Sequence, residues 1–122
     1  MKRIFFVFAL MVIATSSEYF VRIAEITVDP KYLQEYKVLL SEGVRDSMRL
    51  EKGVILLYPV FNQQKPNYLY VLEIYANKRA YQNHLKTKHF LRYKEKTQHM
   101  VLELKLVDVD PIVSLNQKDK EQ

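Results

Sequence analysis

The sequence predicts a small α+β domain with the ferredoxin-like order β-α-β-β-α-β, in which both helices cover one face of an antiparallel sheet. Two observations predict this fold. Four segments of strand length, rich in β-branched and aromatic residues, alternate with two helical stretches in that order. The chain has 122 residues, which is the length of one domain preceded by a short targeting segment.

The first strand is expected over residues 19–28, and the first helix follows it directly. Asp29 offers a helix N-cap, and Pro30 occupies the first helical position, where its missing N–H costs nothing. Gly43 within the helix costs about 1 kcal/mol relative to alanine, so its C-terminal half is expected to bend or fray. Apolar residues in the helix recur at spacings of three and four, at Leu33, Tyr36, Leu40, Val44 and Met48.

A β-hairpin is expected next. Two apolar runs, at residues 54–61 and 68–76, are joined by a polar connection at residues 62–67 that contains a proline. Gly53 marks the exit from the first helix into this hairpin.

The second helix and the last strand complete the pattern. Asn77 can cap the helix, which is expected to break at Thr87 or Lys88 and to resume toward Met100. Residues 102–109 alternate leucine with charged residues and predict the last strand.

The two hairpin strands are apolar on both faces, whereas a sheet with one face in water should alternate more cleanly. We therefore expect a homodimer in which two sheets pack face to face, leaving a pocket in each subunit.

The N-terminus has the layout of a secretory signal peptide. Lys2 and Arg3 precede an apolar run over residues 4–14, and small residues then offer cleavage after Ala14 or Ser16. The alternative is a short uncleaved anchor, but the run is shorter than the 18 or so residues of a spanning helix. We expect a signal peptide at residues 1–16, a domain at residues 17–111 and a polar tail at residues 112–122. The mature protein is then exported, periplasmic or secreted, without a stable membrane anchor.

Composition excludes several classes of protein. Removal of residues 1–16 takes away two of the 19 basic residues and none of the 14 acidic ones, so the formal charge falls from +5 to +3. The basic residues of 86–96 alternate with apolar ones as on a solvated helix face, so nucleic-acid binding is not expected. The chain lacks cysteine, which excludes disulfides and thiolate zinc sites, and two glycines leave no room for a phosphate loop.

His84 and His89 are the most informative candidates for chemistry, because histidine titrates near neutral pH and Tyr93 follows them closely. They are five residues apart, so a continuous helix would point them in different directions, whereas a break near Thr87 would bring them together. Either histidine could act as a general base, or both could simply bond to backbone carbonyls. No third ligand has recognisable spacing, so a metal site is not expected.

Glu73 and Tyr75 share one strand face, and Tyr58 is a candidate on the neighbouring strand. A carboxylate on an apolar face is costly to bury unless it is paired or functional. Glu73 is therefore either a site residue or the partner of a cation across the dimer interface.

From Arg22 to Pro111 the chain resembles the antibiotic biosynthesis monooxygenase family, particularly its small quinol monooxygenases. The matching stretches are residues 22–30, 53–60, 72–76, 80–84 and 87–90, with Tyr93. The resemblance implies a dimeric α/β barrel and a pocket bordered by His84, Glu73 and Tyr75. It also implies chemistry such as the cofactor-free oxidation of phenols or quinols. Haem-degrading members pair a tryptophan with their histidine, and this chain has no tryptophan.

The expected function is a cofactor-independent monooxygenase that acts on a quinol or a similar hydroxylated aromatic, without a metal. His84 is expected to act as the base, Tyr75 as the hydrogen-bond donor to the developing oxyanion, and Glu73 as the group that orients or charges the histidine. His89, Tyr93 and Tyr58 are expected to contact the substrate. The alternatives are an isomerase acting on a small carbonyl or sugar-derived signal molecule, and a non-catalytic dimer that binds a small apolar ligand.

Overall fold

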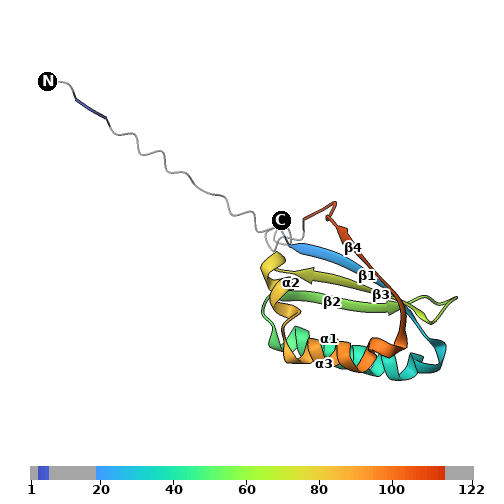
Figure 1. The fold of residues 1–122 in the computed structure, drawn as a ribbon. Helices are drawn as coiled ribbons and strands as arrows, with labels where there is room; N and C mark the ends of the chain where they lie inside the picture. Colours follow the sequence, from blue (N-terminus) through green and yellow to red (C-terminus); the bar gives the residue numbers. More distant parts are fainter. Residues whose placement is uncertain (1–2, 6–18, 115–122) are drawn as a thin grey trace.

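The computed structural model describes residues 3–5 and 19–114. Most of the predicted signal peptide at residues 1–16, and residues 115–122 of the predicted tail, lie outside the described residues. The elements follow the predicted order, with a single sheet and helices on one of its faces (Figure 1). They are β1 (Phe20–Val28), a 3-10 turn (Pro30–Tyr32), α1 (Leu33–Leu50), β2 (Val54–Phe61), β3 (Tyr68–Tyr75), α2 (Lys78–His84), α3 (Lys88–Thr97), a second 3-10 turn (Gln98–Met100) and β4 (Val101–Val109).

The sheet has the strand order β2-β3-β1-β4, and every neighbouring pair is antiparallel. Ala24 in the central strand β1 is opposite Val71 of β3 on one side and Leu106 of β4 on the other. This arrangement confirms the predicted ferredoxin-like α+β fold.

α1 starts as the sequence predicts but does not break at its glycine. The Asp29 side chain accepts a hydrogen bond from the Lys31 backbone N–H at 3.1 Å, and Pro30 begins a short 3-10 turn that leads into the helix. The helix then continues through Gly43 to Leu50. Tyr36 and Leu40 are buried against the sheet, and this packing outweighs the modest cost of one glycine.

The second helical stretch is divided, as predicted, at Thr87. α2 ends at His84, and the Thr87 hydroxyl donates to the His84 carbonyl at 2.8 Å. The same hydroxyl caps α3 by accepting from the Phe90 backbone N–H at 3.3 Å. Asn77 caps α2 in the expected way, by accepting from the Ala80 N–H at 2.8 Å.

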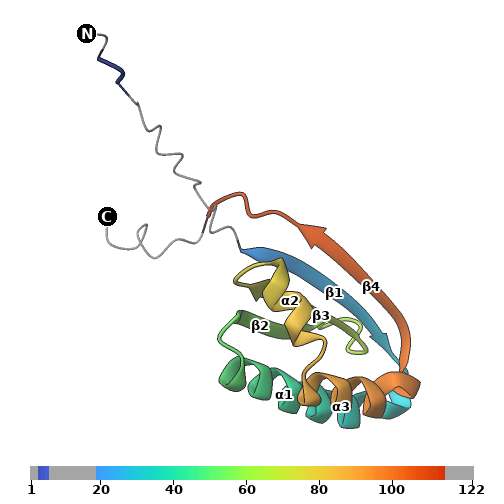
Figure 2. The same cartoon turned by 60° about the vertical axis from the view of Figure 1, so that its left-hand side comes forward.

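The helices lie on one face of the sheet and cover that face unevenly. The core lies between the sheet and α1, whereas β4 curves away from α1 and α3 (Figure 2). On β4, the three leucines on the helix side of the sheet are therefore 42–63% exposed: Leu102, Leu104 and Leu106. The opposite face of the sheet carries exposed apolar side chains such as Tyr58 and Val60. Among the described residues, no helix is long and apolar enough to cross a membrane.

Candidate functional site

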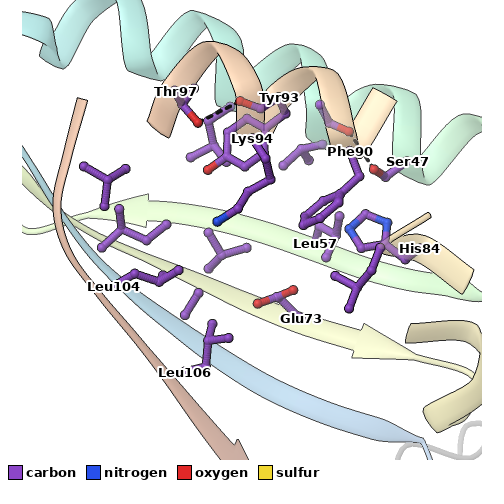
Figure 3. Close-up of a pocket in the computed structure, with 18 of the residues that line it drawn as sticks. Ser47, Leu57, Glu73, His84, Phe90, Tyr93, Lys94, Thr97, Leu104 and Leu106 are labelled. Atoms are coloured by element: carbon purple, nitrogen blue, oxygen red, sulfur yellow. Dashed lines mark hydrogen bonds between the residues drawn. The ribbon is translucent and has the colours of Figure 1, made fainter. Parts of the chain in front are cut away.

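A cavity of about 380 Å³ lies between the sheet and the helices. Its volume is typical of small-molecule sites, which are concave and mostly apolar with a few convergent polar groups. The apolar wall includes Leu57, Val71, Phe90, Leu104 and Leu106. Figure 3 shows Leu57, Phe90, Leu104 and Leu106 around the cavity together with His84 and Glu73. Lys94 extends from α3 toward the sheet.

His84 is the central polar group of the cavity. It is the last residue of α2, it is 5% exposed, and its ring packs against the Phe90 ring with centroids 4.8 Å apart. Its Nδ1 lies 2.8 Å from Oε2 of Glu51. The same carboxylate oxygen lies 2.7 Å from Nε2 of His89.

The three residues of this cluster lie at the ends of three helices, α1, α2 and α3. Glu51 is the C-cap residue of α1 and has an extended backbone, which directs it out of the helix. His84 ends α2, and His89 lies in the first turn of α3. The break capped by Thr87 turns the chain between the two histidines, so residues five apart in sequence place their ring centroids 6.3 Å apart.

The carboxylate fixes the proton of His84. When a neutral His84 donates Nδ1–H to Glu51, its lone pair is at Nε2, the other ring nitrogen. His84 lines the cavity, and Glu51 and His89 are not among the lining residues. The arrangement therefore presents a hydrogen-bond acceptor at the cavity and a negative charge behind it, as a general base requires.

Glu73 belongs to a separate pair on β3. The Tyr75 hydroxyl donates to Oε1 of Glu73 at 2.5 Å, and Tyr75 is fully buried. Burial raises the pKa of Glu73, while the Tyr75 hydrogen bond and the charges of His84 and Arg22 oppose that rise. Burial, followed by the charge of Glu73, raises the pKa of Tyr75 well above its ordinary value.

Two cationic side chains, Arg22 and Lys94, line the same cavity as the Glu73 carboxylate. The Arg22 guanidinium lies 4.3 Å from the centroid of the Tyr81 ring and donates to the Tyr81 hydroxyl. Its Nε also donates to Asp108 at 2.8 Å. Arg22, Tyr81 and Lys94 all line the cavity, so it holds donors suited to an anionic oxygen.

Tyr93 also lines the cavity, but its hydroxyl is hydrogen-bonded to that of Tyr36 on α1. Burial raises the pKa of Tyr93. This pair ties α3 to α1 beside the cavity, and Tyr93 presents chiefly its ring to the space.

The structure distributes the predicted site residues over three places. His84, Glu73 and Tyr93 line the cavity, while Tyr75 and His89 lie behind Glu73 and His84 respectively. Tyr58 lies on the opposite face of the sheet and is 60% exposed, so any contact with substrate stays a prediction. Glu51, rather than Glu73, is hydrogen-bonded to His84.

Sequence reasoning missed Glu51, Arg22, Tyr81, Phe90 and Lys94. For Glu51 one signal existed. A carboxylate at the C-terminus of a helix opposes the helix dipole, so its presence there suggests a role other than helix stability. Glu51 also supplies the third donor group that the spacing of the histidines alone did not indicate.

Comparison with known proteins places the chain in a family. The sequence profile described as antibiotic biosynthesis monooxygenase matches residues 19–96. A solved structure of a proposed antibiotic biosynthesis monooxygenase from Bacteroides thetaiotaomicron is 43% identical, with a TM-score of 0.80, over 82% of this chain and 95% of that one. None of the curated proteins compared with the chain matches it significantly.

Two further solved structures are similar. A proposed monooxygenase from Lactobacillus acidophilus is 28% identical with a TM-score of 0.72, and the match covers 74% of this chain and 43% of that one. A proposed antibiotic biosynthesis monooxygenase from Nitrosomonas europaea is 18% identical with a TM-score of 0.74, over 79% and 92% of the two chains. At that identity the last similarity supports the fold alone.

Proposed function

The chain belongs to the antibiotic biosynthesis monooxygenase family, and from this premise we propose that it is a cofactor-independent monooxygenase acting on a quinol or a similar hydroxylated aromatic. The observation that carries the proposal is His84, which borders an apolar cavity of about 380 Å³ with its Nδ1 held 2.8 Å from Glu51. A base so placed can take a proton from a phenol that binds against the apolar wall of the cavity.

The first step is proton transfer. Nε2 of His84 accepts the phenolic proton, and the Glu51 carboxylate stabilises the resulting imidazolium through Nδ1–H. The proton and its charge stay on His84, while the substrate becomes an electron-rich phenolate. Arg22, Tyr81 and Lys94 are the cavity donors available to hold that oxyanion.

Dioxygen then reacts with the phenolate. One electron passes from the anion to dioxygen, and the two radicals combine to form a carbon–oxygen bond. His84 returns its proton to the outer peroxide oxygen, the oxygenated ring carbon loses its C–H proton as the O–O bond breaks, and the outer oxygen leaves with both protons as water. For a quinol, the sum is quinol plus dioxygen giving hydroxyquinone plus water. The substrate supplies all the electrons, so no external reductant is needed.

Two further proposals concern the oligomeric state of the protein and its export. We propose that the exposed apolar residues on the outer face of the sheet, including Tyr58 and Val60, pack against a second copy to form a homodimer. The signal-peptide pattern at residues 1–16 supports export of the mature protein.

Oxygen uptake by metal-stripped protein, offered a panel of benzoquinols, naphthoquinols and simple phenols, tests the reaction. With dioxygen labelled by oxygen-18, we expect one labelled atom in the product and the other in water, at a rate above spontaneous autoxidation. Tight binding of a quinol without uptake would indicate a binding protein. Rearrangement of a carbonyl compound without uptake would indicate an isomerase, and either result would overturn the proposal.

A further inference from the structure

The cluster of Glu51, His84 and His89 presents three donor atoms of kinds that bind metals. We propose that these side chains form a site for one divalent first-row transition metal ion, represented here by Zn²⁺. The inference goes beyond the proposed function, because the oxidation needs no metal ion, although it uses two of the three side chains, His84 and Glu51.

The geometry is close to that of a bound ion. Oε2 of Glu51 lies 2.8 Å from Nδ1 of His84 and 2.7 Å from Nε2 of His89, and all three atoms lie within 4.8 Å of one another. A zinc ion lies about 2.0–2.2 Å from each nitrogen or oxygen ligand, so a tetrahedral site needs donors roughly 3.3 Å apart. To reach that spacing the carboxylate oxygen must move outward by about half an ångström, and the two imidazole nitrogens, which lie within 4.8 Å of each other, must turn toward a common point.

The donor set selects the class of metal. Two imidazoles and one carboxylate suit zinc, cobalt, nickel or iron, whereas calcium and magnesium prefer oxygen ligands alone. Without a metal, one carboxylate oxygen accepts both N–H groups. With a metal, each imidazole remains neutral, and its proton moves to the other ring nitrogen.

The cluster is shielded but not closed. The side chains of His84, Glu51 and His89 are 6%, 13% and 14% exposed. Water can therefore complete the coordination of an ion from the side of Glu51 and His89. All three residues lie at the boundaries of helices.

The location decides what the ion would do. Of the three ligands, only His84 lines the cavity, so an ion bound at its Nδ1 lies on the side of the ring away from the substrate. The ion would place the proton of neutral His84 on Nε2 and remove the acceptor from the cavity. Metal binding should therefore inhibit the oxidation, and this consequence, unlike the binding itself, rests on the proposed function.

Metal titration of the full mature protein tests the site directly. Zn²⁺ affinity is measured by competition with a chromophoric chelator, and Co²⁺ coordination by its visible absorption. We compare wild type with His89→Ala, and with His99→Ala as the matched control, because His99 is exposed and packs on Tyr32 instead. Circular dichroism confirms that each variant folds, and His89→Gln replaces His89→Ala if the latter does not.

We expect one ion per chain in wild type and in His99→Ala. In His89→Ala the Zn²⁺ affinity should fall by at least about 100-fold. Loss of a residue that only supports a metal ligand costs about 10- to 100-fold, so a fall of this size indicates that a ligand itself has been removed. Zn²⁺ should inhibit oxygen uptake by wild type, and His89→Ala should resist that inhibition relative to its own metal-free rate.

Absence of stoichiometric binding, or equal affinity in wild type and His89→Ala, would overturn the metal site. Binding that depends on His89 in a protein without any oxygen uptake would leave the metal site standing and remove the proposed function. Binding that depends on His89 without inhibiting an active enzyme would overturn the inhibitory role.

Discussion

Glu51 and Glu73 are both shielded carboxylates near His84, but their partners differ. Glu51 lies at the end of α1, and one of its oxygens is within 2.8 Å of both His84 and His89. Glu73 lies within β3, and its recorded hydrogen bond comes from the neutral Tyr75 hydroxyl. Two imidazoles lie within hydrogen-bonding distance of one Glu51 oxygen, whereas one phenol donates to Glu73, and burial raises the pKa of Glu73.

Because their surroundings differ, the two glutamates are suited to different tasks. Glu51 is suited to stay charged behind the base and to hold its proton in place. Glu73 faces the cavity and is suited to exchange hydrogen bonds with a hydroxyl group of the substrate. Pairs of carboxylates whose environments differ are a recurrent feature of acid–base sites.

The largest expected difference between the two carboxylates is in turnover. Glu51→Gln should lower kcat/KM by about 100-fold, because it removes the charge that stabilises the imidazolium and allows the amide to favour the wrong tautomer of His84. Glu73→Gln keeps a hydrogen-bonding group at the cavity and should cost less than about 10-fold, mainly in KM. Steady-state oxygen uptake measures both, and the reverse order would exchange the two assignments.

A smaller effect is expected on stability when the Glu73 pair is broken. Tyr75→Phe removes the donor at 2.5 Å and leaves a shielded carboxyl without that partner, at a cost of about 1–3 kcal/mol. Urea unfolding gives this value, with Tyr70→Phe as a comparison on the other face of the same strand. A cost no larger than that of the comparison variant would show that the Tyr75 bond contributes little.

The pH dependence of stability sharpens the same comparison. The folded pKa of Glu73 is raised above its ordinary value of 4.5, so its contribution is fully present below pH 4.5 and is lost as the pH rises through the folded pKa. Glu73→Gln should therefore raise Tm at neutral pH and change it little below pH 4.5. A stabilisation that does not depend on pH would contradict a buried, titrating Glu73.

The smallest effect is expected at the turn that joins the histidines. Thr87→Ala removes the cap of α3 and should cost about 1 kcal/mol. It should also loosen the contact of His89 with Glu51, which NMR titration of the two histidines can follow. Thr27→Ala, in β1 and not itself a capping residue, is a matched control. Equal destabilisation by the two changes would remove the capping role.

The elements were predictable because they depend on local signals. Asp29–Pro30, Asn77 and Thr87 act within a few residues of their own positions, and the structure uses each as the sequence indicates. Strand alternation placed Glu73 and Tyr75 on one face of the sheet, and the family resemblance implied that Glu73 borders a pocket; Glu73 does line the cavity.

The remaining site residues depend on tertiary packing. Glu51 reaches His84 across 33 positions of sequence, because α1 ends beside the break between α2 and α3. Tyr58 lies outside the cavity because of a register shift between Val54 and Leu56, which places Tyr58 opposite Leu72 on the outer face. Without that irregularity, Tyr58 would be opposite Val71 on the cavity side, and no local pattern in the sequence revealed the shift.

The most direct test of the account is the oxygen uptake of His84→Ala, measured on metal-stripped protein with the best substrate of the panel. His99→Ala is the matched control, and free imidazole is added to both. We predict a loss of at least about 100-fold in His84→Ala, partial recovery with imidazole, and an unchanged rate in His99→Ala. A His84→Ala enzyme as fast as wild type would contradict the assignment of His84 as the base.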